Sequence, residues 1–169
     1  MNLFFRMLRI FVMGLFRSRI DLLDSSELRF RVLPTDLDIN VHMTNARYLS
    51  FMDLGRTDLL IRAGLLKMMH REKLMPVVGH IDIKFRRSLS PFQRFSLTSR
   101  LICWDEKWLY MEQRIESATG LHSVAIVRGL FLDRSGSVPT QRLLDYLGYQ
   151  GESPAMPEEV LRMKSGITE

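Results

Sequence analysis

The chain has 169 residues, 46% of them hydrophobic and 25% charged, which suits one soluble globular domain with a continuous core. Its single cysteine, Cys103, excludes an internal disulfide and a cysteine-based metal cluster, as in proteins of a reducing compartment. Residues 1–20 hold four arginines and no acid, so most of the net charge of +5 lies there and the remaining residues carry 20 basic side chains (24 minus 4) against 19 acidic ones. A nearly neutral body excludes a broad phosphate-binding face, and we expect no nucleic-acid partner.

Residues 1–20 are also the most apolar stretch, and we expect them to form a basic amphipathic helix. Arg6, Arg9 and Arg17 share one flank of a helical wheel, and large apolar side chains cover the other flank. Such a helix would lie in a membrane interface with its arginines toward anionic headgroups. The longest apolar run, Ile10–Phe16, is far shorter than the roughly 20 residues that span a bilayer. We therefore expect a cytoplasmic protein in peripheral contact with the inner membrane. The alternative is a terminal helix packed on the body or on a partner subunit.

The next residues predict a strand, a loop and a long buried helix. Residues 28–33 alternate apolar and basic side chains until Pro34, as a strand does. Residues 35–45 are rich in Asp, Asn and Thr, which indicates a loop. From about residue 45 to residue 63, large apolar side chains recur at helical spacing, and Gly64 is placed to end that helix. So many large apolar side chains predict that the helix is largely buried.

Four strands are expected after this helix, followed by two short helices. The strand-like segments are residues 77–89, 94–103, 107–118 and 121–132. Thr119-Gly120 suits a tight turn between the last two segments, and the last segment is apolar on both faces, which predicts a central strand. The helices are expected over residues 140–147 and from Pro157 onward.

This order of elements predicts an α+β hotdog fold, in which an antiparallel five-stranded sheet wraps around a long central helix. Such a sheet must bury one face, and the one long apolar helix is the obvious element to cover it. We expect residues 1–20 to be a basic amphipathic N-terminal segment, residues 21–138 the hotdog domain, and residues 139–169 short C-terminal helices.

The loop before the long helix carries several groups that could do chemistry. It contains Asp38, Asn40 and His42 just ahead of a helix N-terminus, whose free N–H groups and partial positive charge suit an oxyanion. A carboxylate or an imidazole in that position could activate water or attack a carbonyl. The alternative is structural, because Asp and Asn are common in turns and Asn45 could cap the helix.

No metal or other cofactor is expected. The series Asp36-x-Asp38-x-Asn40 imitates the start of an EF-hand, but Val41 stands where glycine is needed and Arg47 where glutamate is needed. The four histidines show no metal-ligand spacing, and the common nucleotide-binding and nucleophile motifs are absent from the sequence. Cys103 is expected to be a buried small apolar residue.

The run from Asp36 to Tyr48 resembles the signature of hotdog proteins of the 4-hydroxybenzoyl-CoA thioesterase type. Its Asp-x-Asn-x-His core is also similar to the loop of plant acyl-carrier-protein thioesterases. The likeness is greatest to the proteins called thioesterase superfamily member six, and it covers about residues 28–134. The resemblance implies hydrolysis of a fatty acyl thioester of coenzyme A or of an acyl-carrier protein by a homodimer or homotetramer. The acyl chain would lie beside the central helix, and the site would lie at a subunit interface.

The resemblance also implies roles for single residues. Asp38 matches the aspartate that acts as nucleophile or general base in the family. Asn40 and His42 match residues that orient substrate or water, and Asp36 looks like a supporting loop residue. Residues that could bind substrate are Asn45 and Tyr48 at the start of the helix, with Lys84, Arg86 and Arg87 for the phosphates of coenzyme A or of a carrier-protein arm. The alternative for these three basic residues is that they are solvated charges on a strand.

Three functions therefore stay open. The first is an acyl-thioester hydrolase, which agrees best with the motif. The second is a catalytically weak acyl- or lipid-binding module held at a membrane surface by residues 1–20. The third is a dehydratase on the same fold, which the motif favours least.

Overall fold

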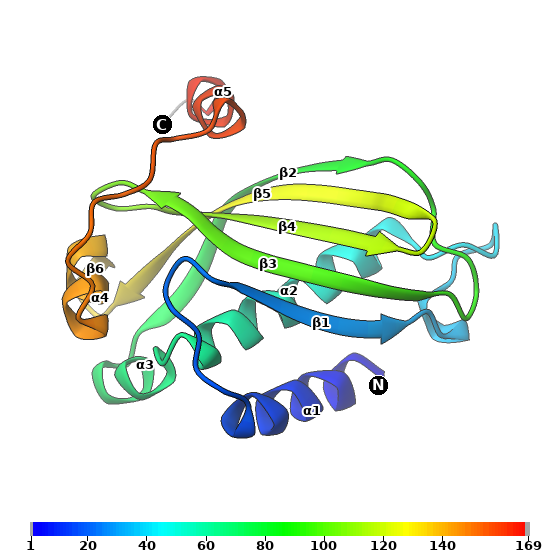
Figure 1. Cartoon of the computed structure of the whole chain (residues 1–169), viewed down its shortest axis with the longest axis horizontal. Helices are drawn as coiled ribbons and strands as arrows, with labels where there is room; N and C mark the ends of the chain where they lie inside the picture. Colours follow the sequence, from blue (N-terminus) through cyan, green and yellow to red (C-terminus); the bar gives the residue numbers. More distant parts are fainter. Residues whose placement is uncertain (1, 168–169) are drawn as a thin grey trace.

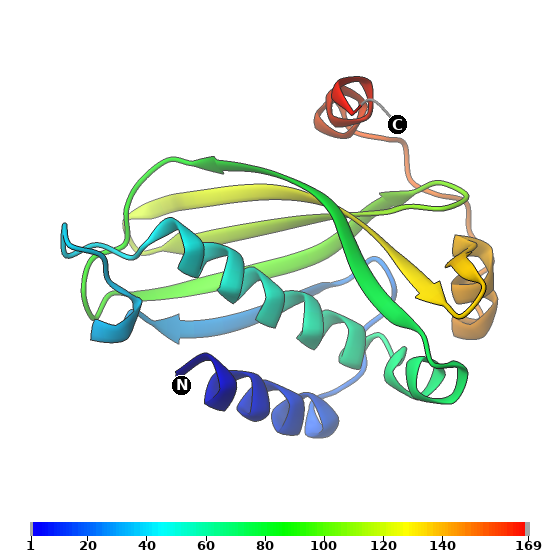
Figure 2. The same cartoon turned by 180° about the vertical axis from the view of Figure 1, so that it is seen from behind.

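A curved antiparallel sheet wraps around one long helix in the computed structural model, which describes residues 2–167 (Figure 1, Figure 2). The helices are α1 (Asn2–Phe16), α2 (Asn45–Arg62), α3 (Leu66–Glu72), α4 (Thr140–Leu147) and α5 (Glu158–Gly166). The strands are β1 (Ser25–Arg31), β2 (Met75–Phe85), β3 (Arg94–Trp104), β4 (Leu109–Ser117), β5 (Gly120–Asp133) and β6 (Gly136–Val138). The sheet follows the order β1-β3-β4-β5-β2, every pair is antiparallel, and β6 pairs with β5. The predicted α+β hotdog arrangement is confirmed, with the short β6 added to the five expected strands.

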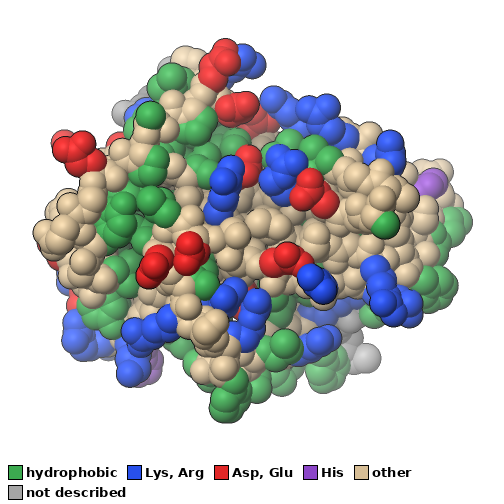
Figure 3. Space-filling model, in the orientation of Figure 1, with side chains coloured by type: hydrophobic (Ala, Val, Ile, Leu, Met, Phe, Trp, Pro, Cys, Tyr) green, Lys and Arg blue, Asp and Glu red, His purple; other side chains and the backbone are tan. Residues whose placement is uncertain are grey.

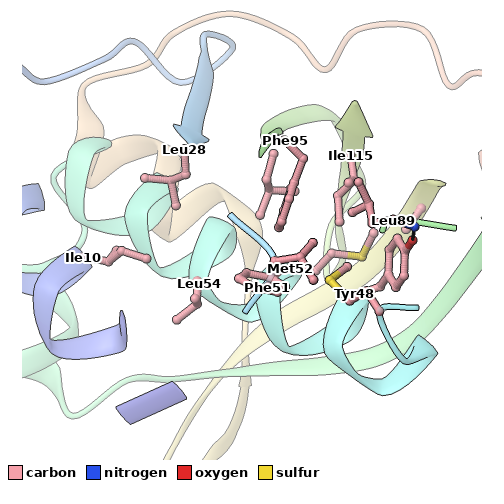
Figure 4. Close-up of a cluster of buried hydrophobic side chains, with 13 residues drawn as sticks. Ile10, Leu28, Tyr48, Phe51, Met52, Leu54, Leu89, Phe95 and Ile115 are labelled. Atoms are coloured by element: carbon pink, nitrogen blue, oxygen red, sulfur yellow. Dashed lines mark hydrogen bonds between the residues drawn. The ribbon is translucent and has the colours of Figure 1, made fainter. Parts of the chain in front are cut away.

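The main core lies between α2 and the concave face of the sheet (Figure 4). Alternate residues of a strand point to the same face, so β3 and β4 bury Leu97 and Ile115 against the helix. From α2, Tyr48, Phe51 and Met52 are almost completely removed from solvent. Burying a large apolar side chain stabilises a fold by about 1.5–3 kcal/mol. In the single chain, packed side chains therefore fill the space between α2 and the sheet.

Gly55 allows the backbone of α2 to lie directly on the sheet. A Cβ atom at this position would lie 2.5 Å from Oγ of Ser99, 2.7 Å from Cδ2 of Leu97 and 3.0 Å from Nε2 of Gln113. All three neighbours are completely buried, so they have little room to move. A helix residue with any side chain would have to push α2 away from the strands.

A buried polar network beside Gly55 joins α2 to β3 and β4. The Nε2 group of Gln113 donates to the carbonyl oxygen of Met52 (2.9 Å) and to Oγ of Ser99 (2.8 Å). Its Oε1 atom accepts from Nη1 of Arg56 at 2.7 Å. Burial lowers the pKa of Arg56, while the neighbouring carboxylate of Asp53 acts in the opposite direction. The amide of Gln113 is thus hydrogen-bonded at both ends, as a buried polar side chain requires.

α1 is a helix, as predicted, but Arg6 in this helix and Arg17, which directly follows it, face the body of the protein rather than outward. It lies along α2 with Ile10 buried between them (Figure 2, Figure 4). Arg6 binds the buried carboxylate of Asp36, and Arg17 binds that of Asp58. A carboxylate that is removed from water needs such a cation. The prediction that the arginine flank faces lipid headgroups is therefore wrong for Arg6 and Arg17. Among residues 2–167, no helix has the length and apolar character to cross a bilayer.

The remaining elements agree with prediction in kind and differ in extent. α4 coincides with the predicted residues 140–147, and α5 begins directly after Pro157. The first strand starts at residue 25 instead of 28, because Ser25 pairs in register with Arg100 of β3. α3 was not predicted; it has seven residues and buries only Met68, too little for a recognisable period. Cys103 is buried, as predicted, and burial raises the pKa of its thiol to about 11.

Candidate active site

The loop between β1 and α2 folds into a small reversal of the chain. It opens with a 3-10 turn over Pro34–Asp36 and closes through an isolated antiparallel bridge between Leu37 and Met43. The backbone N–H of Asp38 donates to the carbonyl oxygen of His42 at 2.9 Å. Val41 adopts a φ of +59°, in the left-handed region that suits a tight reversal. The loop therefore projects the stretch from Asp38 to His42 beyond the body of the domain.

The carboxylate of Asp38 organises this projection. Its Oδ1 atom accepts the backbone N–H of Asn40 (2.9 Å) and that of His42 (3.2 Å). Turns are often closed in this way by an aspartate, so the structural alternative accounts for part of the motif. The side chains of Asp38, Asn40 and His42 are all exposed in the single chain. The structure thus brings the three predicted catalytic residues onto one loop tip and presents them outward.

Asp36 has a different environment, although it lies only two residues earlier. It is completely buried, and its carboxylate binds Arg6 of α1 and the backbone N–H of Leu33. A substrate has no access to this carboxylate, so Asp36 supports the loop. The sequence motif did not identify Arg6, because a residue 30 positions away in the chain gives no local signal.

The N-terminus of α2 follows this loop directly. Thr44 is the N-cap residue, and within residues 2–167 its side chain makes no capping hydrogen bond. Asn45 is the first helical residue and is exposed, so the alternative that Asn45 caps the helix is wrong. The first N–H groups of a helix carry a partial positive charge when no side chain caps them. Asn45 and these N–H groups lie on the same side of the domain as the loop tip.

Tyr48 of the first turns of α2 is buried and joins the helix to residues 85–89. Its hydroxyl accepts the backbone N–H of Leu89 (3.1 Å) and donates to the carbonyl oxygen of Arg87 (3.4 Å). Its ring meets that of Phe85 edge-on at 5.2 Å. Burial raises the pKa of Tyr48, which keeps the phenol protonated as a donor. In the single chain, Tyr48 therefore holds the framework of the site and is not open to substrate.

The three predicted phosphate-binding residues lie at the same end of the domain and are all exposed. The guanidinium of Arg87 donates through Nη1 to the carbonyl oxygen of Thr119, in the turn between β4 and β5. The backbone N–H groups of Arg86 and Arg87 both donate to the carbonyl oxygen of His122. Lys84 lies at the end of β2, so all three cations lie within residues 84–87. The hydroxyl of Tyr48 connects this stretch to α2 through the carbonyl oxygen of Arg87.

His122 is a buried residue that supports this stretch. Its Nδ1 atom lies 3.1 Å from the carbonyl oxygen of Arg87, and its Nε2 atom lies 2.7 Å from Oγ of Ser117. Since a carbonyl can only accept, Nδ1 carries a proton. His122 is thus a core residue that holds the backbone of Arg87 in place.

A cavity within residues 2–167 lies elsewhere in the domain. It has a volume of about 540 Å³ and is lined by residues 104–107, residues 137–141 and Leu144. These residues lie at the end of β3, in the turn that follows it, in β6 and at the start of α4, opposite to the loop tip (Figure 1). None of the predicted site residues lines it. In the described part of the chain, no group of three or more His, Cys, Asp or Glu side chains could hold a metal ion.

Comparison with known proteins places these features in a family. Residues 32–163 match the thioesterase-like superfamily. Protein THEM6 of Xenopus laevis is 35% identical over 144 residues, which cover 83% of this chain and 68% of the relative. A probable thioesterase of Saccharomyces cerevisiae is 31% identical over 130 residues, which cover 75% of this chain and 56% of the relative. The chain therefore spans between about half and two thirds of the length of these relatives.

Solved structures agree with the fold. The probable thioesterase YbaW of Escherichia coli superposes with a TM-score of 0.67 at 24% identity, covering 73% of this chain and 96% of that one. A Staphylococcus aureus protein solved in complex with CoA superposes with a TM-score of 0.64 at 18% identity, covering 90% and 98%. At these identities the likeness establishes a shared architecture.

Proposed function

The chain belongs to the thioesterase-like superfamily, and from this premise we propose that it hydrolyses a fatty acyl thioester carried by coenzyme A or by an acyl-carrier protein. The observation that carries the proposal is the loop tip: Asp38 and His42 are held together directly ahead of the uncapped first turn of α2. A carboxylate, an imidazole and a helix N-terminus supply a base, a positioning group and an oxyanion site. This hydrolysis requires no cofactor.

Asp38 acts on the thioester in one of two ways. As a general base it takes a proton from water, whose oxygen adds to the carbonyl carbon. As a nucleophile its carboxylate adds to that carbon itself and gives a mixed anhydride, which water then cleaves. In both routes the oxyanion forms near the first turn of α2, the C–S bond breaks, and the thiolate takes up a proton. Asn40 and His42 hold the substrate or the water in position.

The variants Asp38→Asn and His42→Ala test this assignment. Asparagine keeps the oxygen that accepts the N–H groups of Asn40 and His42, so Asp38→Asn should leave the loop folded. We expect kcat to fall by about 10²–10⁴-fold in a thiol-release assay on acyl-CoA and acyl-carrier-protein thioesters of several chain lengths. Glu152→Gln removes an exposed acid from the C-terminal segment and should keep the wild-type rate. Wild-type rates from both loop variants on every accepted substrate would contradict the assignment.

A catalytically weak acyl-binding module is the second candidate. The exposure of all three loop side chains favours it, because general acid–base catalysis works best where water is excluded. This candidate predicts saturable binding of acyl-CoA, measured by calorimetry, without release of thiol. Turnover above the uncatalysed rate eliminates a pure binding module. Saturable binding without turnover of any tested thioester eliminates the hydrolase.

We also propose that a second copy of the chain adds to β2 and covers the loop tip. β2 ends the sheet, is 11 residues long and exposes Val78 and Phe85. Natural proteins rarely leave a long apolar edge strand uncovered, because its free N–H and C=O groups pair with other chains. The end of β2 lies beside the site, since the ring of Phe85 contacts that of Tyr48. A copy bound along β2 would shelter Asp38 and His42, in a homodimer or within a homotetramer.

The oligomeric state tests this arrangement. Light scattering coupled to size exclusion should give a dimer or tetramer for the wild type. Val78→Asp should produce monomers and lower kcat together, because an unpaired buried charge opposes association. Leu161→Asp places the same charge on an exposed leucine of α5 and should change neither property. A monomeric wild type with full activity contradicts a shared site.

We propose that Lys84, Arg86 and Arg87 bind the phosphates of the carrier group. They are exposed cations at the end of the domain that holds the loop. Arginine forms paired hydrogen bonds to phosphate, and lysine adds a point charge. Their position next to the predicted shared edge would place the carrier arm between two copies.

We propose, finally, that α1 contacts an anionic membrane surface through its outer face. This face is apolar: Phe4 and Phe16 are 68% and 86% exposed, and Arg9 in the same helix and Arg19 shortly after it are also exposed. Figure 3 shows hydrophobic side chains along the lower edge of the molecule, where α1 lies in Figure 1. An exposed apolar patch rimmed by cations fits the interface of a bilayer. Seven exposed apolar side chains form it: Phe4, Phe5, Leu8, Phe11, Val12, Leu15 and Phe16.

Vesicle sedimentation tests the membrane contact. Wild-type protein should bind vesicles that contain phosphatidylglycerol more tightly than pure phosphatidylcholine vesicles. A variant with Phe4→Ser and Phe16→Ser should bind at least about tenfold more weakly, because each lost phenyl ring removes about 1.5–3 kcal/mol of burial. Leu161→Ser is the matched control. Equal binding by the double variant, or no binding by the wild type, contradicts the contact.

A further inference from the structure

The buried carboxylate of Asp36 ties the two ends of the candidate catalytic loop together. Its Oδ2 atom accepts the backbone N–H of Leu33, before the loop, at 2.9 Å. Its Oδ1 atom lies 3.6 Å from Nε of Arg47, in the first turn of α2. The backbone carbonyl oxygen of Asp36 accepts the backbone N–H of Thr44 at 3.0 Å. Asp36 thus touches the segment before the loop and the helix after it.

The main cation for this carboxylate comes from outside the loop. Arg6 of α1 donates through Nη2 to Oδ2 (2.8 Å) and through Nη1 to Oδ1 (3.3 Å) of Asp36. Such a two-pronged contact fixes the orientation of a carboxylate as well as neutralising it. The side chain of Arg6 is 13% exposed and that of Asp36 only 1%, so water screens the pair weakly.

Arg6 also contacts the central helix. Its guanidinium carbon lies 4.6 Å from the ring centroid of Phe51, which is completely buried in the main core. A planar guanidinium can bind a carboxylate with its edge while its face lies on an aromatic ring, and lysine cannot do both. Arg6 therefore joins three elements at one point: α1, the loop and α2.

We infer that Arg6 is a positioning residue for Asp38, and that α1 is part of the working site. Without Arg6, the buried carboxylate of Asp36 keeps only the more distant Arg47 as a cation. A carboxylate in that state turns toward water, because burying an unpaired charge is costly. Leu37 directly follows Asp36 and forms the bridge to Met43 that closes the base of the loop tip. A movement of Asp36 would therefore shift this bridge and displace the loop tip. The inference rests on the proposed function.

Arg17, the residue directly after the C-terminal end of α1, provides a matched control. Arg17 donates through Nη1 to Oδ2 of the buried Asp58 (3.0 Å) and through Nη2 to the carbonyl oxygen of Glu27 (3.1 Å). Asp58 lies in the second half of α2 and also accepts a hydrogen bond from Ser26 of β1. Arg17→Ala therefore loosens the same helix as Arg6→Ala without touching the loop.

The experiment compares Arg6→Ala, Arg6→Lys and Arg17→Ala in the full chain. Two readouts are used: kcat and KM in the thiol-release assay, and hydrogen exchange of the amides of residues 37–44. Arg6→Ala should lower kcat by about 10- to 100-fold with a smaller change in KM, since a misplacement near 1 Å costs about that much. It should also speed exchange in the loop by about tenfold or more. Arg6→Lys should lie between Arg6→Ala and the wild type, and Arg17→Ala should keep kcat within about twofold of the wild-type value.

Two results overturn the inference. One is an equal loss of kcat in Arg6→Ala and Arg17→Ala, which would mean that loosening α1 is sufficient to lower kcat without any specific effect on the loop. The other is wild-type exchange of residues 37–44 in Arg6→Ala. Hydrogen exchange does not depend on turnover, so an inactive wild type whose loop still responds to Arg6→Ala would refute the hydrolase and keep the positioning role. An active wild type with an unresponsive loop would refute the positioning role alone.

Discussion

Replacing Gly55 by alanine should destabilise the fold, although alanine is the better helix former. Gly55 is in the interior of α2, where exchanging glycine for alanine normally stabilises by about 1 kcal/mol. Here the new methyl group would lie 2.5 Å from Oγ of Ser99 and 2.7 Å from Cδ2 of Leu97. Both side chains are completely buried, so the helix must move instead.

The magnitude follows from overpacking and from the polar network. Inserting a methyl group into a filled core typically costs about 1–3 kcal/mol. Lifting α2 also stretches the hydrogen bonds that Gln113 makes to Met52 and Arg56, each worth about 1 kcal/mol net. After the gain in helix propensity is subtracted, we expect a net loss of about 2–3 kcal/mol. For a domain of this size that lowers Tm by about 4–12 °C.

Urea unfolding followed by circular dichroism measures this loss directly. Gly166→Ala, at the last residue of α5, is the control, because a Cβ atom there meets no other heavy atom within 4 Å in the described structure. It should be neutral or stabilise by up to about 1 kcal/mol. If Gly55→Ala unfolds at the wild-type urea concentration or above it, the close approach of α2 to the sheet is not what requires glycine.

Three further predictions concern Cys103, the buried network of Gln113, and the exposed cations Lys84 and Arg86. Burial raises the pKa of Cys103 to about 11 from 9.0. At pH 8 the native thiol should therefore react with iodoacetamide at least about 100-fold more slowly than the unfolded thiol. The free energy of unfolding should fall as pH rises above about 9, because the unfolded thiol ionises first. Gln113→Ala should cost about 3 kcal/mol in urea unfolding, because it leaves Nη1 of Arg56 and the carbonyl oxygen of Met52 without their buried partner; a loss below about 1 kcal/mol would contradict this role. The double variant Lys84→Ala with Arg86→Ala should raise KM for acyl-CoA about tenfold at low salt with little change in kcat. In 0.5 M NaCl most of the difference in KM between variant and wild type should disappear, because salt screens the charges. An unchanged KM would contradict phosphate binding by these two residues.

The elements of the fold could be predicted because their signals are local. Residues 121–132 are apolar on both faces, which predicted a strand inside the sheet, and β5 does lie between β4 and β2. The turn residues Thr119-Gly120 join β4 to β5, with Gly120 at a φ of +107°. α3 escaped prediction because seven residues are too few to show a helical period. The inward orientation of Arg6 and Arg17 could not be read from a helical wheel, which shows flanks but not which flank is buried.

For the candidate site, the sequence by itself located the loop and the residues on it. Asp38, Asn40 and His42 do share one loop tip ahead of α2, because the spacing of a tight turn is a local property. Their catalytic roles remain predictions. Which aspartate is buried was decided by contacts between residues far apart in the chain, since Arg6 lies 30 positions before Asp36.

The sequence thus determined the order of the elements, the fold class and the position of the candidate site, all of which depend on hydrophobic period and turn residues. Only the tertiary structure decided that Arg6 of α1 and the adjacent Arg17 turn inward while α1 directs an apolar face outward. It also decided that the loop tip is exposed while Tyr48 is buried. The physical reason is that burial and ion pairing are properties of surfaces that meet, and α1, the loop and α2 meet only after the chain has folded.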